Sequence, residues 1–289
     1  MASALPAGNI ARQLYRHVGK DWVIGFILVP YGRMRQRALR ARCPRSDCHT
    51  YTSFYRSPPQ LDALCGPVLS RLEEKGADPL SILVLAGSNG AEAYTLASEI
   101  RARRPDLDFH IKASDLHEHT VRHAEKATYT LNEITQGLPV PEDFLERTFD
   151  LVDGLFVVKP EIRALVSFET ADLLAPEIVD RFRPADIVFV QNVLFHLPPD
   201  MARKAFANVL RLLKPGAFLF IEGMELDMRS ELTKAADLVP LDYRVKEIYE
   251  YSRRHIPTFW WRHYFGNEPY SRLSSNRIAR YSTIFIAPN

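Results

Sequence analysis

The sequence predicts an α/β fold in which a mostly parallel sheet is covered by helices on both faces. From residue 81 onward, short apolar runs alternate with helical patterns, an order typical of βαβ units. The clearest unit is Ser81–Tyr94, where the apolar run Ile82–Leu85 ends in the small-residue turn Ala86–Gly90 and a helical pattern follows. A second apolar run, Phe109–Ala113, leads to an acid at Asp115. Alternation, glycine turn and terminal acid together predict an open, doubly wound sheet.

The remaining elements follow from the same patterns. Strands are predicted at residues 81–86, 109–114, 165–170, 186–191 and 217–223. Helices are predicted near residues 91–103, 117–127, 175–182 and 200–213, and one precedes the first strand over QLDALCGPVLSRLEEKG. The segment LFVVKPEIRALVSFET interrupts the alternation and predicts a hairpin. After Met224 come a helix over VKEIYEYSRRH and a last, β-rich strand over ARYSTIFIA.

The chain divides into a basic, helical N-terminal extension, residues 1–47, and a larger domain, residues 48–289. The extension holds nine Lys and Arg against two acids. We interpret it as a solvated basic helix, although such charge also suits an acidic protein, a nucleic acid or an anionic surface. The apolar run Trp22–Tyr31 is too short to span a bilayer and contains Pro30. We therefore expect a core helix there, no transmembrane segment and no nucleic-acid partner.

Composition and cysteine usage indicate a globular protein of the cytoplasm. Hydrophobic residues make up 46% of the chain and charged residues 25%, which is ordinary for a soluble domain. The cysteine pair in CPRSDC and Cys65 form no disulfide framework and lack a second Cys/His pair for zinc. His119 and His123 are spaced to share a helix face, but His117 lies off that face, so we predict no metal site.

The glycine turn and the acid that ends the second strand indicate a nucleoside site. Gly87 and Gly90 let the backbone approach a ligand closely, and Asp115 is placed to accept hydrogen bonds from ribose hydroxyls. Taken singly, each glycine is equally well explained by a tight turn and Asp115 by a helix N-cap. A nicotinamide dinucleotide site more often shows G-x-G-x-x-G, whereas this turn supplies G-x-x-G. A nucleotide sheet followed by a helix, a loop and a late strand resembles class I S-adenosylmethionine methyltransferases, whose antiparallel seventh strand closes the sheet edge.

A series of motifs over residues 48–224 resembles the catalytic domain of the CheR-type chemotaxis methyltransferases. AGSNGAEAYT is similar to the AGCSTGEEPYS of that family and is one residue shorter. Five further segments resemble family segments in the same order. They are ASD at the end of the second strand (family ASD), YTLNEITQGLP (YRLSEL…LP), DLL (NLL), QNVLFH (RNVLIYF) and LLKPGAFLF (LLKPGG). Upstream, TYTSFYRSPPQL resembles the family's T-x-FFR segment. The resemblance implies a methyltransferase that uses S-adenosyl-L-methionine.

The resemblance also assigns roles to individual residues. It implies that Gly87 and Gly90 approach the methionine and ribose portions of the cofactor, and that Glu92 lies near its amino group or ribose. Further cofactor-binding residues implied in this way are Asp115 at the ribose, Asp172 and Leu173 beside adenine, and Asn192 and Val193 on the sulfonium side. Arg56 is implied to face the acceptor.

The sequence departs from the family at the acceptor end. Gln191 and His196 stand where the family has arginine and tyrosine. A hydroxyl or ammonium acceptor must lose a proton, and His196 is a candidate base because the ordinary histidine pKa is near 6.5; a packing or capping histidine is the equal alternative. We therefore expect a small-molecule acceptor methylated on oxygen or nitrogen. Protein-glutamate O-methylation and a non-catalytic cofactor sensor are the alternatives.

An aromatic cluster follows the penultimate helix. Its members are Trp260, Trp261, Tyr264, Phe265 and Tyr270. Such a cluster suits a cap over the acceptor pocket by stacking or cation–π contact. Packing against the sheet edge is the favoured interpretation, because large aromatic side chains are usually buried.

Overall fold

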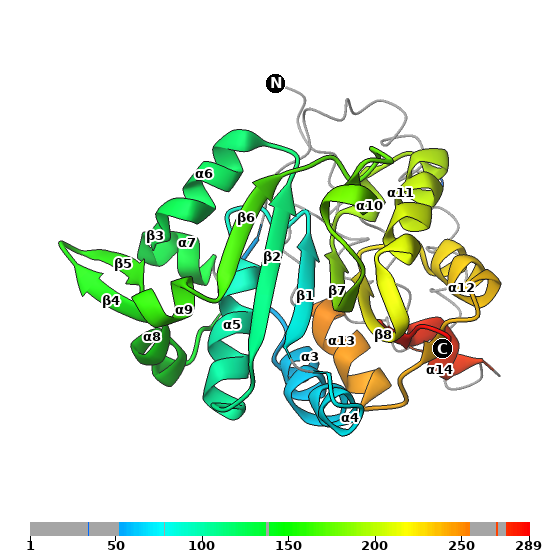
Figure 1. Cartoon of the computed structure of the whole chain (residues 1–289), viewed down its shortest axis with the longest axis horizontal. Helices are drawn as coiled ribbons and strands as arrows, with labels where there is room; N and C mark the ends of the chain where they lie inside the picture. Colours follow the sequence, from blue (N-terminus) through cyan, green and yellow to red (C-terminus); the bar gives the residue numbers. More distant parts are fainter. Residues whose placement is uncertain (1–33, 35–51, 78, 137–138, 255–269, 271–275) are drawn as a thin grey trace, which may run out of the picture.

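The computed structural model describes residues 34, 52–77, 79–136, 139–254, 270 and 276–289. A seven-stranded sheet runs through the centre in the order β6-β2-β1-β7-β8-β10-β9 (Figure 1). The strands are β1 (Leu80–Leu85), β2 (Phe109–Asp115), β6 (Val166–Thr170), β7 (Ala185–Gln191), β8 (Leu213–Glu222), β9 (Val239–Pro240) and β10 (Ile284–Ile286). β6, β2, β1, β7 and β8 pair in parallel, and β10 is antiparallel to both of its neighbours.

The predicted fold class is confirmed, and one detail of the sheet edge is wrong. All five strands predicted before residue 224 are present, and the late strand is antiparallel as expected. That strand does not close the edge, because β9 pairs with β10 on its outer side. β9 consists of Val239 and Pro240 alone. Two residues carry no period-2 pattern, so the sequence could not reveal this strand.

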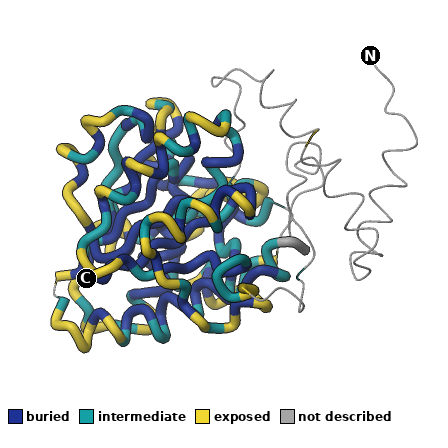
Figure 2. The backbone as a smooth tube through the Cα atoms, turned by 90° about the vertical axis from the view of Figure 1, so that its right-hand side faces the viewer, coloured by how far each residue is buried: buried dark blue, intermediate teal, exposed yellow. Residues whose placement is uncertain are grey.

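Alternating side chains of the strands divide the interior into two cores. Leu80, Ile82 and Val84 of β1 point into one core, and Leu83 and Leu85 point into the other. This two-residue period is what a sheet buried on both faces requires. Buried residues accordingly concentrate along the middle of the molecule (Figure 2).

Helices cover each core from outside. The first core lies under α3 (Pro58–Ala63), the π-helical turn η2 (Leu64–Val68), α4 (Leu69–Glu74), α5 (Ala91–Arg103) and α13 (Val245–Arg254). The second lies under α10 (Ile178–Arg181), α11 (Pro199–Arg211) and α12 (Leu226–Ala235). α6 (Glu118–Lys126) packs along β6 and β2. Near the C-terminus, α14 (Arg277–Tyr281) contacts α12 and α13.

The predicted hairpin lies earlier in the chain than expected. β4 (Phe149–Val152) and β5 (Leu155–Val158) form it, and β3 (Thr128–Tyr129) adds to β5 in a small sheet of order β3-β5-β4 that projects from the main sheet (Figure 1). The turn is Asp153-Gly154, both with left-handed φ, a pair that strongly favours two-residue hairpins. The second half of the expected hairpin is instead α9 (Pro160–Arg163) and strand β6. α7 (Leu131–Thr135) and α8 (Glu142–Thr148) lie between β3 and β4.

Two predicted features fall largely outside the described residues. The basic extension, residues 1–47, is described only at Met34, and the aromatic cluster only at Tyr270. Tyr270 packs against Tyr281 and Tyr249, with ring centroids 4.7 and 6.4 Å away. It is not among the described residues that line the pocket considered next. Within the described part of the chain, no helix is long and apolar enough to cross a membrane.

Candidate functional site

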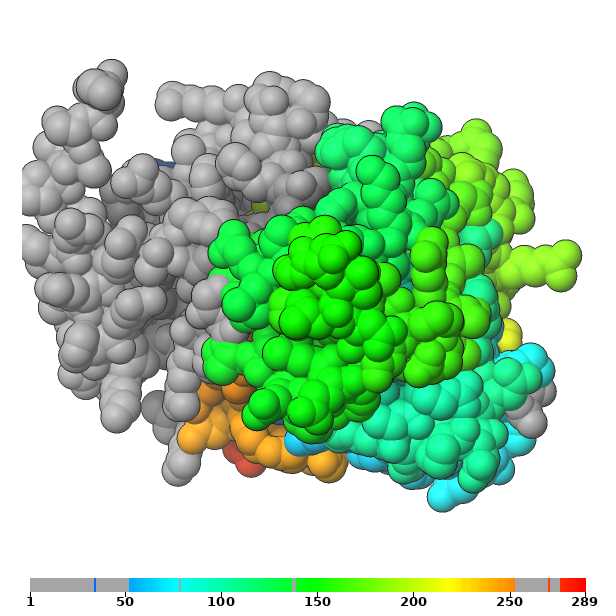
Figure 3. Space-filling view, turned by 90° about the vertical axis from the view of Figure 1, so that its left-hand side faces the viewer, coloured from blue at the N-terminus to red at the C-terminus, as the bar shows by residue number. Residues whose placement is uncertain are grey.

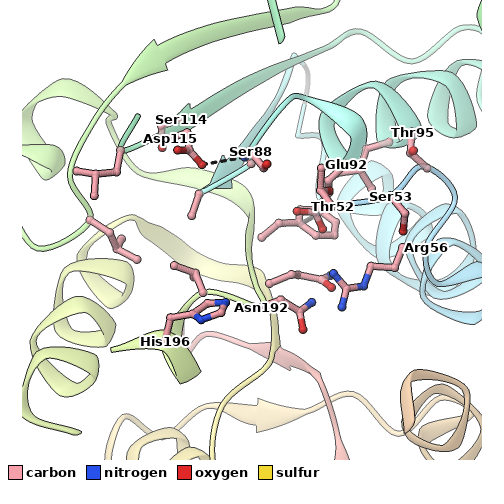
Figure 4. Close-up of a pocket in the computed structure, with 18 of the residues that line it drawn as sticks. Thr52, Ser53, Arg56, Ser88, Glu92, Thr95, Ser114, Asp115, Asn192 and His196 are labelled. Atoms are coloured by element: carbon pink, nitrogen blue, oxygen red, sulfur yellow. Dashed lines mark hydrogen bonds between the residues drawn. The ribbon is translucent and has the colours of Figure 1, made fainter. Parts of the chain in front are cut away.

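A pocket opens at the carboxyl ends of the central strands (Figure 4). Residues 86–88 after β1, 114–117 at the end of β2 and 191–193 at the end of β7 line it. From β1 the chain continues to β2 and β6 on one side, whereas β7 and β8 extend the sheet on the other. The pocket therefore lies where the strand order reverses, the usual ligand site of open α/β sheets. Segment 52–57 and Gln60 of α3 close its far side.

The turn after β1 is held in an unusual backbone conformation. Ala86, Ser88 and Gly90 have φ values of 59°, 53° and 89°. The N–H of Gly87 donates to the carbonyl of Ser114 (2.7 Å), and a Cβ on Gly87 would lie 3.1 Å from Val84. The backbone of the turn thus passes close to the strand ends, and its residues Ala86, Gly87 and Ser88 line the pocket.

Asp115 fixes the turn to the end of β2. Its Oδ2 accepts the N–H of Ser88 (2.9 Å) and its Oδ1 accepts the N–H of His117 (3.0 Å). The residue is buried and lines the pocket. A carboxylate has about four lone-pair sites, so two remain for ligand hydroxyls after these bonds. Asp115 is therefore both a loop-capping residue and a ligand-facing acceptor.

Glu92 and Arg56 approach the pocket from α5 and from segment 52–57 (Figure 4). Burial raises the pKa of the Glu92 carboxyl to about 7, the Arg56 guanidinium opposes that rise, and Glu222 adds to it. Arg56 is the one Lys or Arg among the described residues that line the pocket. Arg56 and Asp115 lie at opposite ends of the view in Figure 4.

The end of β7 makes a second tight turn. Asn192 has a φ of 55°, and its N–H donates to the carbonyl of Glu222 (3.0 Å). Gly223, with a φ of 69°, lies against it: an added Cβ would stand 2.6 Å from Cα of Asn192 and 2.8 Å from the Phe195 ring. A side chain at Gly223 would displace backbone, so this glycine holds Asn192 at the pocket wall.

His196 ends the short 3₁₀ turn η3 (Leu194–His196) and lines the pocket, to the left of Asn192 in Figure 4. Its ring packs on Phe195, with centroids 4.0 Å apart and planes at 34°. The position suits a base or a packing residue, as the sequence left open.

Several buried polar atoms at the pocket have no hydrogen-bond partner within the described residues. They are Oγ of Ser53, Ser57 and Ser88 and Nδ2 of Asn192. Ser57 precedes α3 as its N-cap but makes no side-chain cap bond. Buried polar groups are nearly always paired in native proteins. A ligand that supplies carboxylate, hydroxyl or carbonyl groups would satisfy these atoms, and the Ser88 hydroxyl next to Asp115 fits a polar, nucleoside-type cofactor.

Most of the site residues predicted from sequence meet in this one pocket. Those that line it are Arg56, Gly87, Glu92, Asp115, Leu173, Asn192, Val193 and His196. Gly90 and Asp172 are not among the lining residues. Gly90 is tightly packed, since an added Cβ would lie 3.0 Å from both Phe168 and Ala124. Asp172 accepts the N–H of Leu174 (2.8 Å), which shapes the loop after β6.

Other lining residues were not predicted as site residues from sequence. Among them are Thr52, Ser53, Ser57, Gln60, Thr95 and Ser114. Ser114 could have been inferred, because it lies beside Asp115 at a strand end. Segment 52–57 offers no such signal, since its serines and threonine resemble those of any polar loop.

His117, which precedes α6, and the α6 residues His119 and His123 do not form a cluster that could bind a metal ion. The rings of His117 and His119 are 5.5 Å apart, and His123 is paired with Glu133 at 3.0 Å. Among the described residues there is no group of three His, Cys, Asp or Glu placed to hold an ion.

Known proteins resemble this chain over the same region. The family described as CheR methyltransferase, SAM binding domain, matches residues 50–242. The probable biofilm formation methyltransferase WspC of Pseudomonas putida is 31% identical over 172 residues, which are 59% of this chain and 40% of that protein. Chemotaxis protein methyltransferase 1 of Vibrio cholerae is 28% identical over 199 residues, 66% of this chain and 70% of that protein.

Other matches include a much longer relative and a solved structure. An uncharacterized 104.1 kDa protein of Rhodobacter capsulatus is 27% identical over 230 residues, 75% of this chain. The chain spans only 23% of that relative and 40% of WspC. A solved O-methyltransferase family protein from Burkholderia thailandensis is 17% identical over 80% of this chain and 55% of its own, with a TM-score of 0.38, too low to bear on function.

The family match covers most of the described domain, including the glycine turn, Asp115 and the end of β7. The chain therefore belongs to the CheR methyltransferase family, and the match lies over the S-adenosylmethionine-binding domain of that family.

Proposed function

We propose that this protein transfers the methyl group of S-adenosylmethionine to a side-chain carboxylate of another protein, forming a methyl ester. The observation that carries the proposal is the end of the pocket formed by Arg56, Ser53 and Ser57. Among the described residues, it combines the one Lys or Arg that lines the pocket with two buried hydroxyls that have no hydrogen-bond partner. Guanidinium and hydroxyl groups together favour a carboxylate. The small-molecule acceptor expected from sequence finds no support in the relatives, several of which are named chemotaxis protein methyltransferases.

Methyl transfer to a carboxylate requires a pocket that positions the reacting groups and does not require one that transfers a proton. The cofactor supplies an activated methyl group on a sulfonium. An ionised carboxylate attacks without losing a proton, so the residues mainly need to hold it in line. Glu92 and Asp115 would bind the cofactor, Arg56 would orient the acceptor, and Asn192 would line the wall between them.

The hairpin is a surface that suits a polypeptide. Leu151, Val152 and Leu155 are exposed, and β4 is an edge strand of its sheet. Figure 3 looks onto the side of the molecule formed by residues 118–170, where this hairpin lies. Exposed apolar side chains on a strand edge are typical of peptide contacts. This surface favours a protein acceptor over a small molecule.

The proposal is tested by the chemical stability of the transferred label. The protein is incubated with methyl-tritiated S-adenosylmethionine and a protein extract of its host, and labelled macromolecules are treated with mild alkali. Esters release volatile methanol, whereas methyl ethers and methylamines do not. Alkali-labile label on a protein supports the proposal. Alkali-stable label, or label confined to small molecules, contradicts it.

A hydroxyl or ammonium acceptor is the second candidate, because His196 lines the pocket. For a carboxylate, at saturating cofactor, we expect kcat to stay flat through pH 6–7 and His196→Phe to keep activity within about threefold. For a hydroxyl, the rate should rise through pH 6–7 and the variant should lose on the order of 10²-fold. Steady-state rates across this range decide between the two acceptors.

Cofactor affinity is expected to depend on pH through Glu92. Because its pKa is raised to about 7, protonated Glu92 stabilises the ligand-free protein below about pH 4.5, and that contribution is lost as pH rises through 7. An ammonium group of the cofactor requires the ionised form. Affinity for S-adenosylhomocysteine should therefore rise about tenfold from pH 6 to 8, measured by calorimetry. Glu92→Gln should flatten this profile; an unchanged slope in the variant would place the titrating group elsewhere.

A further inference from the structure

A relay of three hydrogen-bonded side chains, Gln191, Gln60 and Thr283, connects the pocket to the C-terminal strand. Nε2 of Gln191 donates to Oε1 of Gln60 (2.8 Å), and Nε2 of Gln60 donates to Oγ1 of Thr283 (2.9 Å). The three residues are 131 and 223 positions apart in sequence along these two bonds. Gln60 lies on α3, Gln191 ends β7, and Thr283 precedes β10. The relay thus links helix α3, the end of strand β7 and the residue before strand β10.

The inner members of this relay are fixed by burial. Gln60 and Thr283 are each 3% exposed. The carbonyl of Thr283 also accepts the N–H of Ile221 from β8 (2.8 Å), which anchors its backbone to the sheet. The Thr283 hydroxyl can donate or accept, but rotating the Gln60 amide alone would set its Nε2 against Nε2 of Gln191, where neither atom can accept a hydrogen bond. The orientation of Gln60 therefore dictates that of the Gln191 amide.

Gln191 is half-buried and lines the pocket. After its bond to Gln60, its Oε1 and one N–H of Nε2 are not engaged by that relay. It directly precedes Asn192, and its partner Gln60 lies four residues after Arg56. Gln191, Gln60 and Arg56 all line the pocket.

We propose that Gln191 determines acceptor specificity by donating its second amide hydrogen to the carboxylate that receives the methyl group, and that Gln60 and Thr283 are positioning residues that act through it. The inference rests on the proposed carboxylate acceptor. A neutral amide orients one oxygen while leaving it nucleophilic, whereas a second guanidinium beside Arg56 would neutralise the acceptor more fully. A substrate group that presents its own N–H at this point would meet the N–H of Gln191 donor to donor. The contact therefore favours a carboxylate over an amide as the methyl acceptor.

The kinetic test separates acceptor effects from cofactor effects. Gln191→Leu should raise the acceptor KM about tenfold and leave the dissociation constant of S-adenosylhomocysteine unchanged within about twofold. Gln60→Leu should do the same, and the double variant should be no worse than Gln191→Leu alone. Additive losses, or equal losses in cofactor affinity, overturn the positioning role.

Thr283 offers a test remote from the ligand. Thr283→Val replaces the hydroxyl by a methyl group of similar size and should raise the acceptor KM about threefold, with rescue by Thr283→Ser. Thr233→Val is the matched control: Thr233 is also 3% exposed, its Oγ1 donates to the backbone carbonyl of Arg229 at 2.8 Å, and it does not line the pocket. The control should not change KM. A KM shift of equal size in both variants would indicate a general packing effect and contradict the relay.

A spectroscopic measurement needs no acceptor. In ¹H–¹⁵N spectra of the ligand-free protein, the side-chain NH₂ signals of Gln60 and Gln191, assigned from the Leu variants, should both shift in Thr283→Val and not in Thr233→Val. Unshifted signals overturn the relay. If the signals shift but no alkali-labile label forms in the methylation assay, the relay stands and the carboxylate acceptor fails.

Discussion

Replacing Asp115 by alanine is expected to weaken S-adenosylhomocysteine binding by about 10–10²-fold, the largest loss we expect for a cofactor-side residue. Charge-assisted hydrogen bonds to ligand hydroxyls are worth about 1.5–3 kcal/mol, which converts to that range. The variant also removes the acceptor of the Ser88 and His117 N–H groups. The turn that faces the cofactor therefore loses its anchor along with the ribose contact. Isothermal titration calorimetry at fixed pH and salt measures the loss.

A second buried acid provides the control for this prediction. Asp186 accepts from Ser81 (2.7 Å) and pairs with Lys214 (2.8 Å), and it does not line the pocket. Asp186→Ala should lower the thermal midpoint without changing the cofactor affinity of the folded protein. Equal affinities for wild type and Asp115→Ala would mean that Asp115 serves only as a loop cap.

The positions of the main strands and the pocket were predictable because they depend on local, periodic signals. Ile82–Leu85 is followed by small residues, and Phe109–Ala113 leads to Asp115, so both strand ends could be located in the sequence. Parallel strands bring their carboxyl ends to one edge, which places Gly87 and Asp115 together without further information.

Other features depend on contacts between distant residues and could not be predicted. Gly90 was expected to approach the ligand, and the sequence could not show that a Cβ there would also meet Phe168 and Ala124, which are distant in sequence. The orphaned hydroxyls of Ser53 and Ser57 are informative only once burial is known. The Asp153-Gly154 turn is a different case, because Asp-Gly is itself a hairpin signal in the sequence, whereas the predicted hairpin rests on the longer apolar pattern that follows it.

The acceptor end is governed by Arg56, and Arg56→Ala is expected to lower kcat/KM for the acceptor on the order of 10²-fold. The guanidinium is the one Lys or Arg group among the described lining residues. Losing a bidentate partner leaves a carboxylate acceptor both unpaired and poorly aligned for in-line attack. Arg56→Lys should recover only part of the activity, because an ammonium lacks the planar fork.

The affinity of the cofactor decides whether this assignment is correct. If Arg56 faces the acceptor, the dissociation constant of S-adenosylhomocysteine should stay within about threefold of wild type at pH 8, where Glu92 is mostly ionised. At pH 6.5 we expect a larger change in this dissociation constant. Without the guanidinium the pKa of Glu92 rises further, so more of its carboxyl is protonated and cannot pair with the cofactor. A loss at pH 8 that matches the loss in kcat/KM would show that Arg56 binds the cofactor itself. The acceptor carboxylate would then have to be held by Ser53, Ser57 and Gln191.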